Sequence, residues 1–323
     1  MRIGSKGNAV ARVVPQVVAA VAPRSLADNA SDTLRGIALA VLAYMIWTLG
    51  DATAKWVLPD IGVAGAMLWR GVFGLVTVGA LTTCRPGFAG WRRLVPRRWR
   101  LVMARSVLSS FVSVTWYFSW LSMSLADTYA VGFIAPLIMT VLAIPMLGER
   151  IRWRRALSTV VGFAGVLVML RPGGDLWTPV VALLLTGTLV MALTRIMTRQ
   201  LTATETPECQ AFWLLVCHML TGIVLLPTFP GLGGAITPFG WLALAFLGVS
   251  SGVAHCIFAR AYGLAPVSAL APYEYSMMPF AIVFGFVLFA DVPSWSTLAG
   301  AAVVAAAGIY NAYRERLQRF ART

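Results

Sequence analysis

The feature that most restricts the fold of this chain is a series of long apolar segments. A helix needs about 20 apolar residues to cross a bilayer core of about 30 Å. Ten segments come close to or meet this length: 35–56, 62–83, 101–123, 128–147, 154–171, 177–197, 210–229, 238–258, 267–290 and 295–313. Stretches such as Val160–Leu170 lack the alternation of a membrane β-strand. The sequence therefore predicts an all-α polytopic membrane protein with ten transmembrane helices.

The composition points the same way. Of the 323 residues, 59% are hydrophobic and only 12% are charged, whereas soluble domains carry about 25% charged residues. A net charge of +14 does not indicate nucleic-acid binding, because the basic residues lie in short clusters between apolar segments rather than on one face. We expect membrane lipid as a partner, and the chain as a monomer or a homodimer.

The basic residues also predict the orientation. With the N-terminus in the cytoplasm, 22 of the 26 basic residues fall on the cytoplasmic side, and this count treats Arg195 and Arg199 as loop residues. The exceptions are Lys55 and Arg171 outside, and Arg70 and Arg105 within segments. Cytoplasmic loops carry the excess of Lys and Arg, so both termini are predicted to be cytoplasmic.

The segments divide into two halves of five, 35–171 and 177–313, followed by a basic tail at 314–323. Because five is odd, the second half must cross the membrane in the opposite sense. Inverted repeats of this kind recur in secondary transporters, with the substrate site near the midplane. Residues 1–34 are interpreted as a mobile cytoplasmic tail; a cleaved signal peptide and a misplaced start codon remain alternatives.

Several strings together carry a family resemblance. They are Asp51-Ala52-Thr53-Ala54-Lys55-Trp56, Trp69-Arg70-Gly71, Gly148-Glu149-Arg150, Gly162-Phe163-Ala164-Gly165, Ala271-Pro272-Tyr273-Glu274-Tyr275 and Tyr313-Arg314-Glu315. In this order and spacing the chain resembles the EamA-type ten-helix members of the drug/metabolite transporter superfamily, over about residues 35–315. Asp291 departs from the pattern, where the family more often has Glu. The resemblance implies a carrier of small organic solutes in the bacterial inner membrane, not an enzyme, with no cofactor and no single substrate.

Two ionisable residues lie at comparable depth in the first two segments. Asp51 is about four residues from the outer end of its segment and Arg70 about eight residues from the same side. Both are candidates for polar contacts to a substrate, and the sequence also predicts an ion pair between them that would join the two helices. Lys55, one turn after Asp51, is an alternative partner, which would leave Arg70 free to face a cavity.

Glu274 lies about eight residues inside the ninth segment, between Tyr273 and Tyr275. Pro272 and Pro279 each remove a backbone hydrogen bond, and broken backbone at membrane depth is tolerated where it lines a cavity or is buried in protein. A carboxylate removed from water favours its protonated form. Glu274 is therefore a candidate for proton coupling or cation binding, with helix packing as the alternative, and Tyr275 is a candidate cavity wall.

The third segment carries a stripe on one helical face: Arg105, Ser109, Ser113, Trp116 and Trp120. Trp116, near mid-segment, is a candidate wall for flat or cationic ligands, with lipid contact or packing as the alternative. Arg105 is expected to extend to the interface, and Trp120 to anchor there.

His218 and His255 lack a second ligand at helical spacing, so no metal is predicted and core histidines are favoured. The primary hypothesis is a secondary transporter that works by alternating access, proton-coupled or exchanging. Amino-acid, nucleobase, vitamin-like and drug-like solutes all remain open as substrates. The alternative is a membrane-embedded enzyme acting on a lipid or other hydrophobic substrate, although the sequence shows no metalloprotease, nucleophile-elbow or phosphate-loop motif.

Overall fold

The computed structural model describes residues 30–83, 90–149, 153–170, 178–229 and 236–290, together with single positions between 295 and 310. Every element in these ranges is a helix. Seven helices in them are long and apolar enough to cross a membrane: Ser31–Thr83, Trp99–Trp120, Leu125–Leu147, Pro179–Leu201, Pro207–Leu225, Pro238–Leu264 and Val267–Phe289. The chain is therefore an all-helical, multi-span membrane protein, as predicted.

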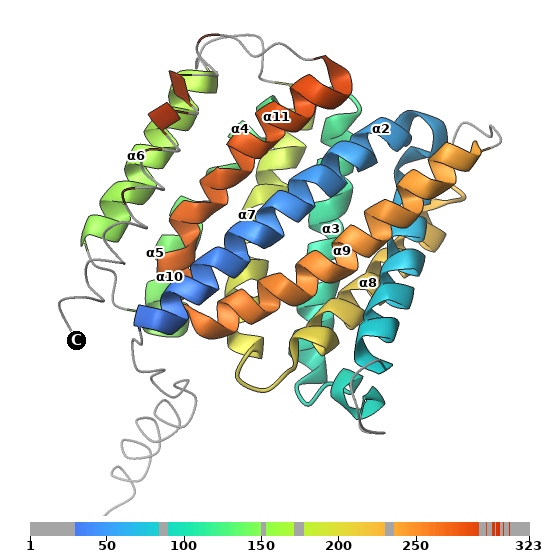
Figure 1. Cartoon of the computed structure of the whole chain (residues 1–323), viewed down its shortest axis with the longest axis horizontal. Coiled ribbons are helices and arrows are strands. Elements are labelled where there is room, and N and C mark those ends of the chain that lie inside the picture. The colour runs from blue at the N-terminus through green and yellow to red at the C-terminus, as the bar shows by residue number, and fades with distance from the viewer. Residues whose placement is uncertain are drawn as a thin grey trace, which may run out of the picture.

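The first two predicted segments lie in one continuous helical element, α2 (Ala30–Thr83), which has two arms. The arms meet at Gly62, whose backbone is not helical, with φ of 66° and ψ of 173°. Only glycine adopts such a conformation without strain. The chain reverses direction at this end of the molecule (Figure 1), so the boundary predicted between 56 and 62 is confirmed in position.

The other elements follow the predicted segments closely. They are η1 (Trp91–Leu94), α3 (Trp99–Trp120), α4 (Leu125–Gly132), α5 (Ala135–Leu147), α6 (Trp153–Leu170), α7 (Pro179–Leu201), α8 (Pro207–Leu225), α9 (Pro238–Leu264), α10 (Val267–Leu270), η2 (Ala271–Ser276) and α11 (Met277–Phe289). The fifth segment corresponds to α6, although α6 is not among the seven candidate spans. Only scattered positions of the tenth are described, so the count of ten stays a prediction.

Some predictions fall outside the described residues. They concern Asp291, the tail at 314–323 and all of the tail at 1–34 except its last five residues, which begin α2.

The fourth helix of each predicted half is discontinuous. In the first half, α4 and α5 are separated at Phe133 and Ile134; in the second, a 3-10 segment, η2, joins α10 to α11. Both end in the left-handed conformation, at Gly148 with φ of 66° and at Ala290 with φ of 55°. The break expected from Pro272 is therefore confirmed, and it has a counterpart in the first half.

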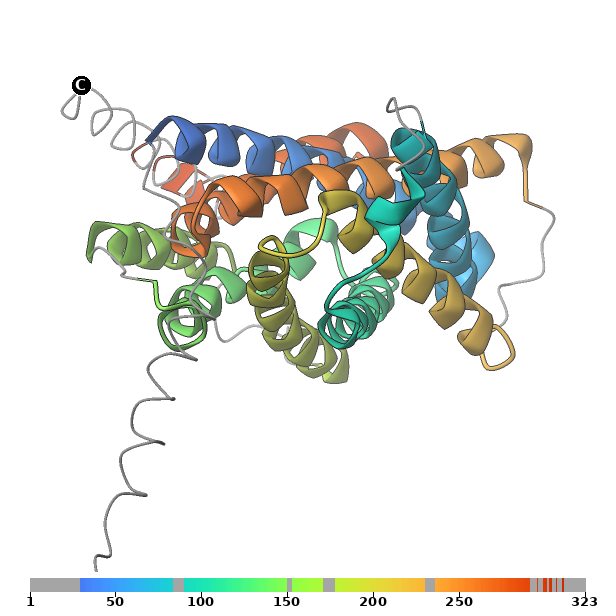
Figure 2. The ribbon, with the colours of Figure 1, turned by 90° about the horizontal axis from the view of Figure 1, so that it is seen from below.

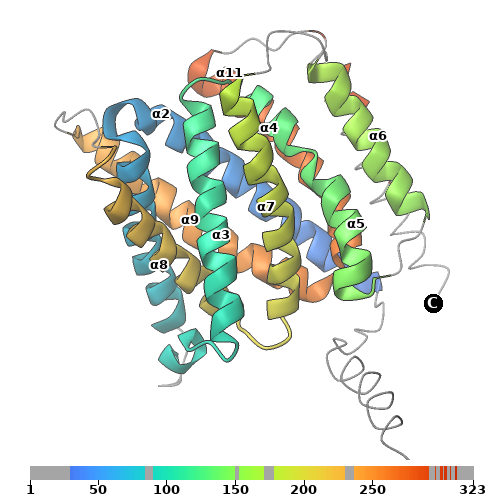
Figure 3. The same cartoon turned by 180° about the vertical axis from the view of Figure 1, so that it is seen from behind.

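The helices form two crossing layers. The first arm of α2, α9 and α11 lie in front in Figure 1, whereas α3, α5 and α7 lie in front when the molecule is seen from behind (Figure 3). The view from below separates the two layers (Figure 2). Helix α6 lies at one edge (Figure 1). Because each layer contains helices from both halves of the chain, contacts between the layers also join the halves.

Threonine followed by proline begins three helices of the second half. Thr206 and Thr237 accept a hydrogen bond from the backbone N–H three residues later, at 3.1 Å in both cases, and Pro207 and Pro238 follow them. Proline suits the first helical turn because its missing N–H would have no helical partner. Thr178-Pro179 begins α7 in the same way, without the side-chain bond.

Glu149 joins the two halves at one end of the molecule. Its carboxylate accepts hydrogen bonds from the backbone N–H groups of Val267 at 2.8 Å and Ser268 at 2.9 Å, in the first turn of α10. A negative charge at a helix N-terminus is favourable. Glu149 thus caps a helix of the other half, which sequence spacing could not show because the two positions are over a hundred residues apart.

Candidate functional site

A pocket lies among helices of both halves. It encloses about 840 Å³ of space between protein atoms, part of which is open to solvent. Its ionisable lining residues are Asp51, Arg70, Arg105, Arg195, His218, His255 and Glu274, and its aromatic ones are Trp47, Trp116, Tyr117, Trp120, Tyr129 and Phe133. Concave sites that join apolar walls to a few polar groups are typical of small-molecule binding.

The predicted stripe on α3 forms one wall of this pocket. All five of its residues line the pocket, from Arg105 near one end of the helix to Trp120 at the other. At 1.5 Å per residue the wall is about 22 Å long. Trp116 lines the pocket as predicted. Trp120 is only 4% exposed and also lines it, so the expected interfacial anchor is wrong.

Arg105 corrects a second prediction. It is 4% exposed and does not extend to the membrane interface. Its Nε donates to Thr198 Oγ1 at 3.1 Å, and its Nη1 donates to the backbone carbonyl of Gln210 at 3.0 Å. Helices α7 and α8 thus supply acceptors that hold the guanidinium inside the protein, which the sequence of α3 alone does not reveal.

Asp51 and Arg70 both line the pocket but do not form the predicted ion pair. Asp51 Oδ2 accepts a hydrogen bond of 2.6 Å from the hydroxyl of Tyr129 in α4. Arg70 donates to Ser251 Oγ at 2.8 Å and to the Tyr117 hydroxyl at 3.0 Å. Neutral hydroxyl groups therefore hold both charges, and the Arg70–Ser251 bond joins the two halves.

Lys55 does not take the place of Arg70 as a partner of Asp51. Its ammonium donates to the carbonyl of Met123 at 3.0 Å and lies 5.5 Å from the centre of the Phe289 ring. Among the described residues, Asp51 contacts Tyr129 and not Lys55.

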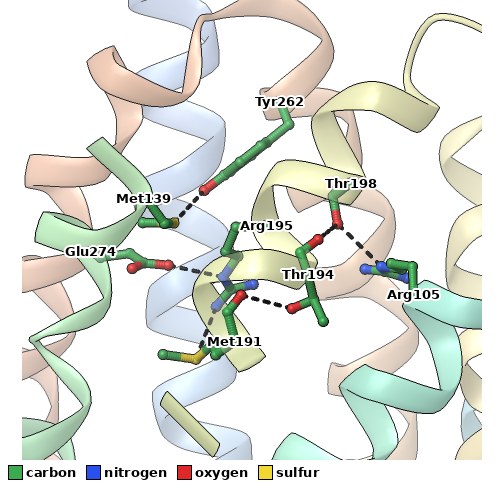
Figure 4. A network of polar contacts seen from close by, with 8 residues as sticks. All are labelled: Arg105, Met139, Met191, Thr194, Arg195, Thr198, Tyr262 and Glu274. Atoms are coloured by element: carbon green, nitrogen blue, oxygen red, sulfur yellow. Dashed lines mark hydrogen bonds and ion pairs between the residues drawn. The ribbon is translucent and has the colours of Figure 1, made fainter. Parts of the chain in front are cut away.

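Glu274 pairs with Arg195, a residue that the sequence analysis counted as part of a loop. Arg195 Nε lies 3.0 Å from Glu274 Oε1 (Figure 4), and the side chains are 12% and 4% exposed. The geometry between the two atoms is not that of a hydrogen bond, so the contact is an ion pair. We counted Arg195 among the cytoplasmic loop residues. That assignment is wrong, because α7 continues to Leu201 and carries Arg195 into the pocket.

Aromatic rings complete the surroundings of Arg195. Its guanidinium carbon lies 4.8 Å from the Trp47 ring centre and 4.3 Å from that of Phe258. Contacts between a guanidinium and an aromatic face are favourable, the more so away from water. Arg195 therefore has one carboxylate and two rings around it, which is how a cation is retained at membrane depth.

The two histidines belong to hydrogen-bonded networks, as favoured above. His218 Nε2 lies 3.2 Å from Ser113 Oγ, and His255 Nδ1 lies 2.7 Å from the carbonyl of Ser251. Both also line the pocket. In the part of the chain that the structure describes, no three His, Cys, Asp or Glu residues are grouped as metal ligands.

Three tryptophans of the lining have a shared property. The indole N–H groups of Trp47, Trp116 and Trp120 are buried and have no hydrogen-bond partner among the described residues. Buried donors are normally satisfied, and a donor left without an acceptor is costly. These groups are therefore available to a ligand that brings acceptor atoms.

Tyr275 does not line the pocket, which corrects its prediction as a wall. It is 1% exposed, and its ring centre lies 5.2 Å from that of Phe133. A Cβ atom added at Gly162 would lie only 2.4 Å from the Tyr275 ring. Tyr275 thus fills the space between Phe133 and α6, and Gly162 serves this packing.

Comparison with known proteins decides the family. Two matches to the EamA-like transporter family cover residues 34–171 and 178–312. The chain belongs to this family. The resemblance seen in the sequence is confirmed, and the chain consists of two EamA domains in tandem, which suggests repeated halves. Since the family is one of transporters, the alternative of a membrane-embedded enzyme is excluded.

Curated relatives span almost the same length. An S-adenosylmethionine uptake transporter of Rickettsia prowazekii is 25% identical, over 90% of this chain and 96% of its own. A riboflavin transporter of Rhizobium johnstonii is 27% identical, over 88% and 93%. The human solute carrier family 35 member G1 is 24% identical, over 88% and 80%. These proteins indicate that relatives carry small organic metabolites of different kinds.

A solved crystal structure has the same fold. It superimposes with a TM-score of 0.71 at 17% sequence identity and covers 90% of this chain and 99% of its own. At that identity the likeness concerns the fold alone. Together with the family match, it supports the helical arrangement in which the pocket lies.

Proposed function

We propose that this protein is a secondary transporter of the bacterial inner membrane that moves a small organic metabolite by alternating access. The observation that carries the proposal is the pocket, because it is lined by charged and aromatic side chains from both EamA domains. A site between two repeats is where secondary transporters bind their substrates.

The proposed arrangement in the membrane keeps the features predicted from the sequence. Ten transmembrane helices form two inverted five-helix repeats, 35–171 and 177–313, with tails at 1–34 and 314–323 and both termini in the cytoplasm. The matching discontinuities in α4–α5 and α10–α11 support a structural repeat. The charge of the loops supports the orientation.

The substrate class follows from the walls. The relatives are named for S-adenosylmethionine and for riboflavin, and each of these molecules combines a flat heteroaromatic ring with many acceptor atoms. The rings of Trp47 and Trp116 suit such a ring system, and their unpartnered N–H groups suit the acceptors. We therefore propose a ring-bearing polar metabolite.

Individual roles follow from the contacts. Trp116 contacts the ring of the substrate, and Arg70 and Asp51 supply charge within the same pocket. Glu274 sets the position of Arg195 through their ion pair and is a candidate coupling group. Tyr275 acts indirectly, because it packs behind Phe133, which lines the pocket. Proton coupling and exchange both remain open.

Alternating access requires that contacts between the halves change. The Arg70–Ser251 hydrogen bond and the cap that Glu149 provides to α10 both join the halves. The contacts within each half differ, because Asp51 binds Tyr129 of its own half and Arg195 binds Glu274 of its own half. We propose that the first type breaks during transport while the second type is kept.

Flux measurements test the proposal. Purified protein in liposomes is given labelled S-adenosylmethionine, riboflavin, aromatic amino acids and nucleosides, one at a time. A carrier gives saturable uptake of at least one compound, and liposomes without protein supply the control. If a thermal unfolding transition shows that the protein is folded and none of the compounds is transported, the proposal is contradicted.

A further inference from the structure

The charges in the pocket are unequally compensated. Three arginines, Arg70, Arg105 and Arg195, share the lining with two carboxylates, Asp51 and Glu274. Glu274 contacts Arg195 directly. Asp51 is the carboxylate that acts electrostatically on Arg70. Arg70 has no carboxylate in direct contact either, but Asp51 acts on it through space, whereas within the described residues no carboxylate acts on Arg105.

The surroundings of Arg105 support this assignment. Its two hydrogen bonds go to neutral acceptors, Thr198 Oγ1 and the carbonyl of Gln210. Among described groups, the ionisable ones that act on it electrostatically are Arg195, which repels it, and the thiol of Cys217. A buried cation is costly unless it is paired, and an ionisable residue at membrane depth marks a functional site by default.

Unused hydrogen-bonding capacity lies at the same end of the pocket. The two bonds of Arg105 use Nε and Nη1, so the described residues provide no acceptor for Nη2. Gln210 does not itself line the pocket, but its backbone carbonyl accepts from Arg105; it is 1% exposed, and among the described residues its side-chain oxygen and nitrogen lack a partner. Figure 4 shows Arg105 facing Thr198 across the gap between α3 and α7. A guanidinium with free N–H groups matches a carboxylate in geometry.

We propose that Arg105 forms an anion subsite that binds the carboxylate of the substrate, with Thr198 and Gln210 holding the guanidinium in place. This inference rests on the proposed function and narrows it to ring-bearing metabolites with a carboxylate group. Trp116 and Trp120 lie at the other end of the α3 wall, with Cα atoms about 16 and 22 Å from that of Arg105 along the helix axis. An elongated molecule with its ring and its carboxylate at opposite ends fits this arrangement.

Two matched ligands test the subsite without any substitution. S-adenosylmethionine carries a carboxylate that its decarboxylated form lacks, and both keep the same ring and sulfonium group. Because a charge-assisted hydrogen bond is lost, we expect the decarboxylated form to bind the wild-type protein about tenfold more weakly or worse. Binding is measured by the ligand-dependent rise in melting temperature of the purified protein. Equal affinity for the two ligands would overturn the subsite.

Variants then assign the effect to Arg105. Arg105→Gln should bring the two affinities within about twofold of each other, and Arg105→Lys, which keeps the charge, should retain part of the difference. Arg100→Gln is the control, because Arg100 is exposed on the same helix; it should behave as wild type. If Arg105→Gln does not fold, the comparison of the two ligands in the wild-type protein and in Arg105→Lys still tests the subsite.

The outcomes separate this inference from the proposed function. If the wild-type protein binds and transports uncharged riboflavin, and Arg105→Gln leaves this unchanged, the carboxylate subsite is wrong while the transporter stands. If riboflavin and S-adenosylmethionine both fail, and no other metabolite of the flux panel is transported, the proposed function itself is contradicted.

Discussion

Arg195 Nε of α7 lies 3.0 Å from Glu274 Oε1 in η2, and both residues line the pocket. The first half has a related contact, in which the Tyr129 hydroxyl of α4 donates to Asp51 of α2 at 2.6 Å. In each half, a polar residue on the first helix thus contacts the discontinuous fourth helix. In the second half this contact lies in the 3-10 segment itself, and in the first half it lies four residues before the break at Phe133.

The Arg195–Glu274 pair is expected to behave as a unit. Arg195→Gln and Glu274→Gln should each lower the melting temperature strongly, because breaking a buried pair leaves one charge uncompensated at a cost of roughly 3–5 kcal/mol. The double variant should melt above the less stable single variant. Thermal unfolding of the purified proteins measures all three.

An exposed pair provides the control. Arg35 lies 3.7 Å from Asp32, with side chains 73% and 43% exposed. Arg35→Gln should change stability by less than about 1 kcal/mol. A double Arg195/Glu274 variant less stable than both single ones would show that the charges do not depend on each other.

Tyr129→Phe removes the hydroxyl that binds Asp51 and leaves the ring. The carboxylate then lacks its donor, so we expect a loss of about 1–3 kcal/mol in stability and reduced transport. Melting temperature and initial flux rate are the two readouts. Tyr310→Phe, at a half-exposed position, should change neither. Wild-type stability and flux in Tyr129→Phe would show that the contact has no role.

Replacement by alanine is expected to have opposite effects on stability at two glycines of α2. A Cβ atom at Gly71 would lie 2.6 Å from the backbone nitrogen of Met219 in α8, whereas a Cβ at Gly79 would meet nothing within 4 Å. Gly71→Ala should therefore destabilise the protein. Gly79→Ala should be neutral or stabilise it by up to about 1 kcal/mol, because alanine has the higher helix propensity. Equal melting temperatures would contradict the close packing of α2 on α8.

Trp116→Phe removes one unpartnered indole N–H from the pocket while keeping an aromatic wall. We expect weaker substrate binding, by about three- to tenfold, if the substrate accepts this hydrogen bond. The concentration that gives half-maximal flux measures it. Trp241→Phe on the exposed side of α9 is the control and should leave this concentration unchanged. If this concentration is the same for both variants, the indole of Trp116 does not take part in substrate binding.

Much of the fold could be predicted from the sequence because lipid imposes a length and a polarity on every membrane helix. The apolar segments, the reversal between 56 and 62 and the break near Pro272 are local features, and the structure has all three. Asp51, Arg70, Trp116 and Glu274 were found for the same reason, since each is a polar or aromatic residue inside an apolar segment.

Partner choice could not be predicted, because it depends on contacts between helices far apart in sequence. Arg195 lies near the end of its predicted apolar segment, so it was grouped with Arg199 as a loop residue. From the sequence, Arg105 was expected to extend to the interface; in the structure, α7 and α8 supply the acceptors for its hydrogen bonds. One signal was available: Arg195 is followed by Ile196 and Met197, so the apolar face continues beyond it.

Counterflow in liposomes tests the central claim most directly. Liposomes preloaded with an unlabelled substrate are diluted into a trace of the labelled compound, and the internal label is followed in time. A carrier that alternates between two sides predicts a transient accumulation of label above the external concentration, which saturates with the preloaded substrate. Label that only equilibrates, without overshoot or saturation, would indicate an open pore and contradict the account.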